Sequence, residues 1–143
     1  MTWMWWAALS AVAAAATTIL AKAGLSGVAS TTATAIRTAV VLVFAWALVF
    51  AFGEHRAIPQ IARRSMLLLI LSGLATGVSW LAYFRALQLA PASLVSPIDK
   101  LSLPLTLVFA AVWLGEPINW QVGVGLTLMT AGALVILRWS APA

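Results

Sequence analysis

Long apolar runs constrain the fold of this chain more than any other feature. Five stretches of roughly 18 to 22 residues contain almost no charge, and each is long enough to cross a hydrocarbon core of about 30 Å as a helix. Backbone polar groups inside lipid must be satisfied within the segment, which helices achieve. We therefore predict spans at about residues 3–21, 32–52, 66–87, 95–114 and 120–137.

The composition supports the same fold class. Hydrophobic residues make up 64% of the 143 residues and charged residues only 8%, whereas soluble domains average about 25% charged. Such a chain cannot cover a globular surface with polar groups. We predict an all-α integral membrane protein with five transmembrane helices. The net charge of +5 comes from basic residues near span ends, so it indicates topology signals rather than binding of nucleic acid.

Small and aromatic residues in the spans have structural explanations. Gly73 and Gly77 form a GxxxG pattern in the third span, which is typical of close helix packing. Six tryptophans lie at or near predicted span ends, where interfacial anchoring explains them: Trp3, Trp5, Trp6, Trp113, Trp120 and Trp139.

An odd number of spans places the two termini on opposite sides of the membrane. One face receives Arg56, Arg63 and Arg64, and the other receives Lys22, Arg85 and Arg138. Basic residues set orientation, and this balance of three against three permits insertion both ways. The alternative is that the compact arginine cluster fixes one orientation, with its loop in the cytoplasm. Two oppositely oriented copies are a recurring way to build a transporter.

The stretch SPIDKLSLP holds the only adjacent ion pair, Asp99 and Lys100. A capping box explains Asp99 without any function: Ser96 would be the N-cap of the fourth helix, Pro97 its first residue and Asp99 its third. In that arrangement Lys100 points about 100° away from Asp99. The alternative is that Asp99 belongs to a binding site.

Lys100 is harder to explain structurally. A lysine at the centre of a span costs roughly 2.5–3.5 kcal/mol, although snorkelling relieves much of this near a span end. Pro104 lacks an N–H and would leave the Lys100 carbonyl without its helical partner, which predicts a kink. Interrupted helices of this kind often mark binding sites in transporters.

A second candidate site involves the second and third spans. Arg37 lies inside the second span, and Trp80, Tyr83, Phe84 and Leu87 form one stripe on the third. Packing explains such a stripe more simply than ligand binding does. Even so, an intramembrane cation beside an aromatic wall suits a small substrate that carries a carboxylate or phosphate.

These residues together resemble the EamA domain of the drug/metabolite transporter superfamily. The resemblance rests on the order and spacing of YFRALQLAPAS, SPIDKLSLP, the LGEPI turn and a glycine-rich last span, and AKAGLSGV and TATAIRTAVV fit the first two spans. It covers nearly the whole chain, so residues 1–143 are expected to form a single EamA-like membrane domain. Most members carry two such domains, and this chain is similar to the shorter group with one.

The resemblance implies a transporter that often exports amino acids or other small metabolites. It implies one half of an inverted-repeat ten-helix transporter, which must pair, and we expect an antiparallel homodimer in the cell (inner) membrane of a prokaryote. Glu116 matches a turn acid of structural role. The first span has no acid, which disfavours cationic drugs. The following positions match cavity or hinge regions: Arg37, Trp80, Tyr83, Pro97, Lys100 and Pro104.

Three functions therefore stay open. The leading one is a dimeric secondary transporter that binds a small-molecule substrate at Lys100, Asp99, Arg37, Trp80 and Tyr83, with hinges at Pro97 and Pro104. A flippase for lipids or lipid-linked head groups would also suit the cations. A non-transporting subunit of a larger complex would need the packing residues but not Lys100. An enzyme is not expected, because the sequence shows no Ser–His–acid set, metal cluster or nucleotide motif. Neither a cofactor nor a metal is expected, because cysteine is absent and the single histidine, His55, cannot form a metal site alone.

Overall fold

The computed structural model describes the backbone of residues 2–140 and the side chains of residues 2–138. The described residues are helical apart from short connections, and five helical stretches are long and apolar enough to cross a membrane. The predicted all-α fold with five apolar helices is confirmed. The chain divides into two compact units, unit 1 (Met1–Leu89) and unit 2 (Ala90–Ala143).

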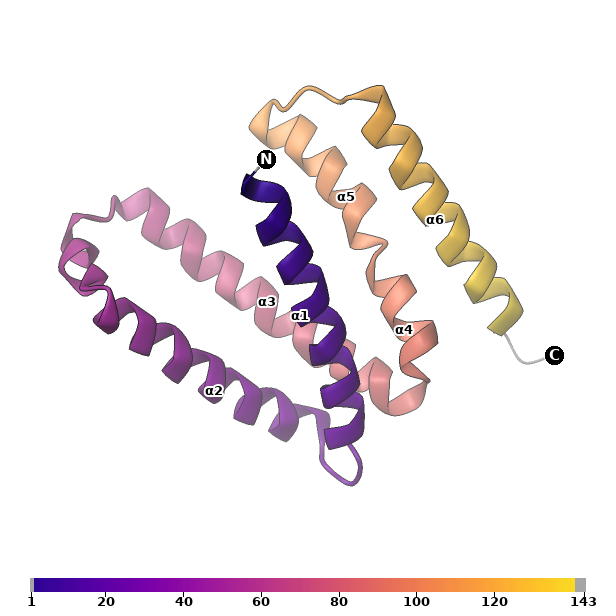
Figure 1. Cartoon of the computed structure of the whole chain (residues 1–143), viewed down its shortest axis with the longest axis horizontal. Coiled ribbons are helices and arrows are strands. Elements are labelled where there is room, and N and C mark those ends of the chain that lie inside the picture. The colour runs from indigo at the N-terminus through magenta and orange to yellow at the C-terminus, as the bar shows by residue number, and fades with distance from the viewer. Residues whose placement is uncertain (1, 141–143) are drawn as a thin grey trace. The chain divides into compact units, whose positions relative to one another are not determined.

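Unit 1 is built from three long helices and one short 3₁₀ turn. In it α3 packs against both α2 and α1, and η1 joins α2 to α3 at one end of the pair (Figure 1). Gly53 has φ 73° directly after α2, a left-handed conformation that favours glycine at a helix end. The elements are α1 (Thr2–Gly24), α2 (Ser30–Ala51), η1 (Glu54–Gln60) and α3 (Arg63–Leu89).

The buried apolar residues of unit 1 lie in the last turns of α3 and in the loop between α1 and α2. Phe84 and Leu87 are 2% and 0% exposed, and Leu25, from the loop between α1 and α2, is 6% exposed. A Cβ at Gly73 or Gly77 would meet no atom within 4 Å beyond the neighbouring backbone of α3 itself. The close helix approach that the GxxxG pattern predicts is therefore not formed within unit 1.

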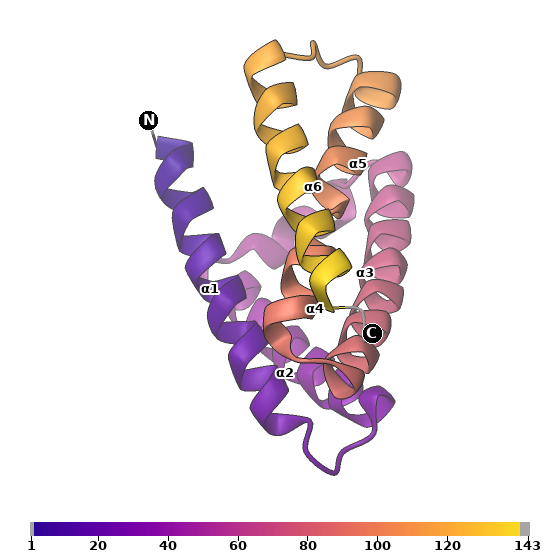
Figure 2. The same ribbon diagram turned by 90° about the vertical axis from the view of Figure 1, so that its right-hand side faces the viewer.

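Unit 2 is a hairpin whose first arm is interrupted. In it α6 packs against both α4 and α5, and Figure 2 shows α5 and α6 side by side. The first arm breaks at Lys100 and Leu101 and ends in one widened π-helical turn, η2. The elements are α4 (Ala92–Asp99), α5 (Ser102–Phe109), η2 (Ala110–Leu114) and α6 (Trp120–Ser140).

The capping box predicted for the fourth span is wrong. The helix begins at Ala92, with Pro91 at the N-cap position and no side-chain cap. Ser96 therefore lies inside α4, and Asp99 is its last residue rather than its third. The break at LAPAS is shorter than expected because Pro91 itself starts the helix: its carbonyl accepts the N–H groups of Leu94 and Val95 at 3.0 and 3.1 Å.

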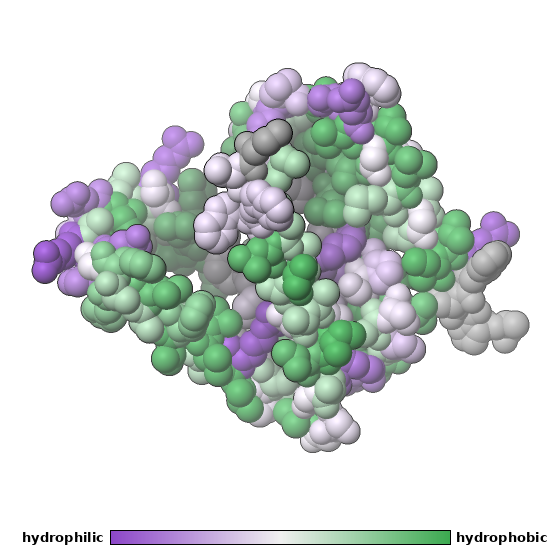
Figure 3. All heavy atoms as spheres, in the orientation of Figure 1, coloured by the Kyte–Doolittle hydropathy of each residue, from purple (hydrophilic) through white to green (hydrophobic). Residues whose placement is uncertain are grey.

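Apolar side chains cover the outer sides of the helices in each unit. In Figure 3, hydrophilic residues gather at the η1 turn of unit 1 and at the loop between η2 and α6 of unit 2. The five predicted anchors Trp3, Trp5, Trp6, Trp113 and Trp120 are all at least 70% exposed, as residues that face lipid or its interface would be. The side chain of Trp139, the sixth, lies outside the described residues.

Candidate functional site

Arg37 of α2 meets the aromatic stripe of α3 inside unit 1. Its guanidinium carbon, Cζ, lies 4.1 Å from the ring centroid of Trp80 and 5.4 Å from that of Phe84. Both distances are within the range of cation–π attraction, which is worth about 0.5–2 kcal/mol. The structure thus brings together two of the predicted site residues, Arg37 and Trp80, and adds Phe84.

The aromatic stripe serves two purposes along its length. Phe84 and Leu87 are buried and belong to the core, as the packing interpretation predicts, whereas Trp80 and Tyr83 are half-buried. The hydroxyl of Tyr83 lies 2.8 Å from that of Thr18 on α1. Thr18 donates its proton to the carbonyl of Ala14 at 3.1 Å, so Tyr83 is the donor to Thr18. Tyr83 therefore ties α3 to α1.

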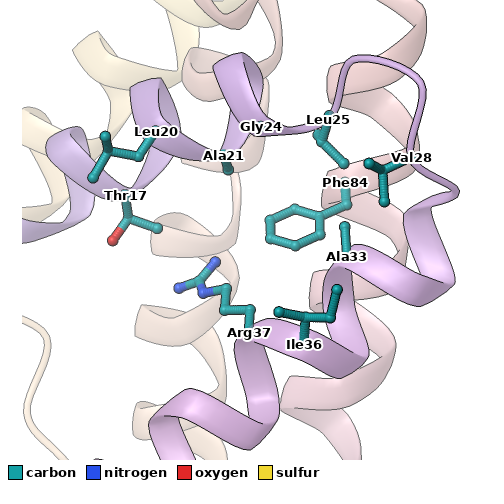
Figure 4. A pocket seen from close by; sticks show the side chains of 10 residues that line it. All are labelled: Thr17, Leu20, Ala21, Gly24, Leu25, Val28, Ala33, Ile36, Arg37 and Phe84. Carbon is teal, nitrogen blue, oxygen red and sulfur yellow. The ribbon is translucent and has the colours of Figure 1, made fainter.

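A pocket of about 420 Å³ in unit 1 has Arg37 in its wall. Figure 4 shows Arg37 of α2, Thr17 of α1 and Phe84 of α3 pointing into the same space. Among the described residues, Arg37 is the only charged one in its wall, and most of the others are aliphatic. The lining residues are Thr17, Leu20, Ala21, Gly24, Leu25, Val28, Ala33, Ile36, Arg37 and Phe84.

A second cavity, of about 640 Å³, lies where the loop between α1 and α2 meets the end of α3. Lys22 donates to the carbonyl of Leu87, and the amide of Gln88 donates to the carbonyl of Val28 at 2.6 Å. Arg85 donates to the side chain of Gln88 at 3.3 Å. These contacts satisfy carbonyls at a helix end and in a loop. The cavity is lined by Lys22, Leu25, Ser26, Gly27, Val28, Ala29, Arg85, Leu87, Gln88 and Leu89.

Sequence reasoning did not single out Gln88, or predict that Lys22 donates a hydrogen bond to the end of α3. Their partners are backbone carbonyls 60 and 65 residues away. A carbonyl is present at every residue, so the sequence holds no signal for which one is used.

Asp99 and Lys100 lie at the break in the first arm of unit 2, where Asp99 is the last residue of α4. The Lys100 Nζ lies 3.5 Å from the Asp99 Oδ2, and the two side chains are 50% and 38% exposed. Lys100 keeps helical backbone angles, with φ −70° and ψ −7°, so its side chain leaves the helix at a different angle from that of Asp99. The contact is made because the long lysine side chain reaches back to the carboxylate.

The sequence suggested that the Lys100 carbonyl is free of a hydrogen-bond partner, but the structure shows that it is not. It accepts the N–H of Leu103 at 3.0 Å. Pro104 then lies in the first turn of α5, where its missing N–H costs little. The predicted interruption is present, but the chain closes it with a tight turn. Pro97 lies inside α4, where it lacks the N–H that the Ser93 carbonyl would accept.

The predicted site residues thus fall into two groups. Arg37, Trp80 and Tyr83 lie in unit 1, and Asp99 and Lys100 lie in unit 2. Their roles toward a substrate stay predictions, as do the hinge roles of Pro97 and Pro104.

Comparison with known proteins identifies the kind of molecule. Residues 1–138 match the EamA-like transporter family. The chain belongs to this family. It is also 46% identical over 134 residues to a protein of Sinorhizobium sp. described as an uncharacterized transporter in the cobO 3′ region. The match covers 94% of this chain and 95% of that relative. No solved structure matches the chain.

Membership confirms the resemblance that the sequence motifs indicate. EamA-like proteins are a family of transporters and not of enzymes. Together with five candidate spans, membership makes this chain a multi-pass integral membrane transporter.

Proposed function

We propose that this EamA-family transporter is a secondary exporter of small organic metabolites, with amino acids as the family expectation. The observation that carries the proposal is the pocket of unit 1, in which Arg37 is held over Trp80 and Phe84. A cation inside a span is costly to insert. A pocket beside Arg37 suggests a binding role for the cation, because a polar solute needs a charged or polar contact to leave water.

We further propose that the whole chain, residues 1–143, works as one domain and pairs as an antiparallel homodimer in the cell membrane of a prokaryote. Five helices enclose little of a polar cavity, and an odd span count makes an inverted second copy useful. The dimer would correspond to a ten-helix transporter with inverted repeats. Lys100 and Asp99 of each copy would then add substrate contacts, and Pro97 and Pro104 would flank the segment that moves during alternating access.

Counterflow in liposomes that contain only this protein tests the proposal. Liposomes loaded with an unlabelled solute should accumulate the labelled form transiently, and a panel of amino acids and organic acids identifies the solute. Flipping of fluorescent lipids without any counterflow would instead favour a flippase. Absence of both activities in well-folded protein would favour a non-transporting subunit and contradict the proposal.

A further inference from the structure

Both cavities of unit 1 carry positive charge, and neither is lined by an acid. Arg37 lines the inner pocket, and Lys22 and Arg85 line the outer cavity. The two lining sets contain no aspartate or glutamate. A solute in either cavity would therefore meet one sign of charge, which favours an anion.

The two cavities share a wall. Leu25 and Val28, from the loop between α1 and α2, line both of them. The loop is held at this position by the hydrogen bond from Gln88 to the Val28 carbonyl. The basic outer cavity, lined by Lys22 and Arg85, is therefore adjacent to the inner pocket, lined by Arg37.

Arg37 has donors available for a ligand. Aromatic rings attract the guanidinium charge but do not accept its five N–H groups as carboxylates do. Within the described part of unit 1, Arg37 forms no ion pair, and its guanidinium lies over the Trp80 and Phe84 rings. A planar guanidinium binds a carboxylate through two parallel N–H···O bonds.

The remaining wall selects the rest of the ligand. Apart from Arg37 and Thr17, it offers aliphatic and aromatic groups, including Leu20, Ile36 and Phe84. An ammonium group in this pocket would be desolvated beside another cation, with no acid in the wall to pair with it, which is unfavourable. A phosphate dianion would leave one of its two charges without a cation.

We propose that the Arg37 pocket binds the carboxylate of an organic acid that has an apolar body and no ammonium group, and that the acid arrives through the basic outer cavity. This rests on the proposed transport function and narrows its substrate class. Amino acids, which carry an ammonium beside the carboxylate, would be poor ligands of this pocket.

Equilibrium binding to the purified full chain in detergent tests the proposal with matched probes. Isocaproate and the amino acid leucine share one carbon skeleton and differ by the ammonium group, and isocaproamide lacks the charge altogether. Titration calorimetry should show isocaproate binding at least ~10-fold more tightly than either of the others, as the loss of a charged hydrogen bond or an unpaired charge predicts.

Arginine variants locate the binding. Arg37→Gln should weaken isocaproate binding ~10- to 100-fold, and Arg37→Lys should weaken it less because the charge remains. Arg64→Gln is the matched control, since Arg64 is exposed at the start of α3 and lines neither cavity. Helix content by circular dichroism and elution volume show whether each variant is folded. If Arg37→Gln does not fold, the binding of isocaproate to Arg37→Lys and the comparison of the three probes still test the proposed ligand class.

Leucine binding as tight as isocaproate binding would overturn the proposal, and so would isocaproate binding that Arg37→Gln leaves unchanged. Transport is judged separately. Arg37-dependent isocaproate binding without counterflow of any solute would support this ligand class while removing the transport proposal. Counterflow of leucine without isocaproate binding would do the reverse.

Discussion

Arg37 and Lys100 both lie within predicted spans, in different surroundings. Arg37 is half-buried against two aromatic rings, and Lys100 is half-exposed beside Asp99. A cation–π contact contributes about 0.5–2 kcal/mol and an exposed ion pair about 0–1 kcal/mol. Insertion of a cation near the centre of a span costs about 2.5–3.5 kcal/mol. No single one of these contacts offsets that full cost, and for Lys100 snorkelling towards the nearer span end relieves much of it.

Lys100→Met should abolish counterflow and leave the protein folded. The ion pair with Asp99 is half-exposed, so its loss should lower the free energy of unfolding by no more than about 1 kcal/mol. Transport rate and thermal midpoint are measured on the same preparation. Normal transport by the variant would show that Lys100 is not a substrate contact, and failure to fold would make it structural.

The double variant Lys100→Met with Asp99→Asn separates two roles of the lysine. If the double variant regains transport, Lys100 serves only to neutralise Asp99. If it stays inactive, the cation itself is required.

Sequence reasoning located the residues better than their contacts. Arg37, Trp80 and Tyr83 were candidates because a cation and an aromatic stripe are visible in apolar spans. Their pairing was not predictable, because it depends on how α2 and α3 pack. Phe84, the second ring over Arg37, looked only like a member of the stripe. Tyr83 in turn bonds Thr18, a contact between residues 65 positions apart.

At the scale of the element, hydropathy predicted the spans and proline predicted the interruption. Both signals are local: apolar length sets a membrane helix, and a missing N–H breaks one. The error lay in where the fourth helix begins and restarts. SPID matches a capping box, but the helix had already begun at Ala92. The N–H of Leu103 donates to the Lys100 carbonyl in a tight turn. A new helix, α5, begins there, and Pro104 lies in its first turn.

Pro104→Ala should join α4 and α5 into a straighter helix and slow transport. The new N–H can bond the Lys100 carbonyl in helical geometry, in place of the tight turn to Leu103. Stability should stay the same or rise. Counterflow rate and thermal midpoint are the measurements, and Pro59→Ala in η1 is the control for a proline outside the interrupted arm. An unchanged transport rate would remove the hinge role.

Gln88→Leu should loosen the loop between α1 and α2 without removing a charge. The Val28 carbonyl would lose its side-chain donor, which should cost about 1 kcal/mol of stability. Hydrogen exchange of the amides of residues 25–29 should become faster. Gln121→Leu in α6, an exposed glutamine of unit 2, should leave that exchange unchanged. Equal rates of amide exchange in Gln88→Leu and the unaltered protein would show that the hydrogen bond from Gln88 to Val28 does not hold the loop.

At the scale of the whole molecule, the question is how a five-span transporter completes itself. The order of the five candidate spans places the loop at Ser26 and the loop at Gln60 on opposite faces of the membrane. The three basic residues near each face are the basis for the prediction that the chain inserts both ways. If the chain does insert in both orientations, it can supply both halves of an antiparallel homodimer. No second protein is then needed.

An antiparallel homodimer predicts that each loop is found on both sides of the membrane. The chain has no cysteine, so Ser26→Cys, at an exposed loop position, gives a single reporter. An impermeant thiol reagent should label it from each side of sealed vesicles in roughly equal fractions. Gln60→Cys, exposed in η1, should be labelled from the two sides in the same proportions.

Two lysines added at the N-terminus should bring that face, and with it Gln60, to the cytoplasm. Ser26→Cys should then be labelled from outside only, and transport should fall with the loss of the opposed copy. Full activity with labelling from one side only would mean that the copies are parallel or that another chain completes the transporter.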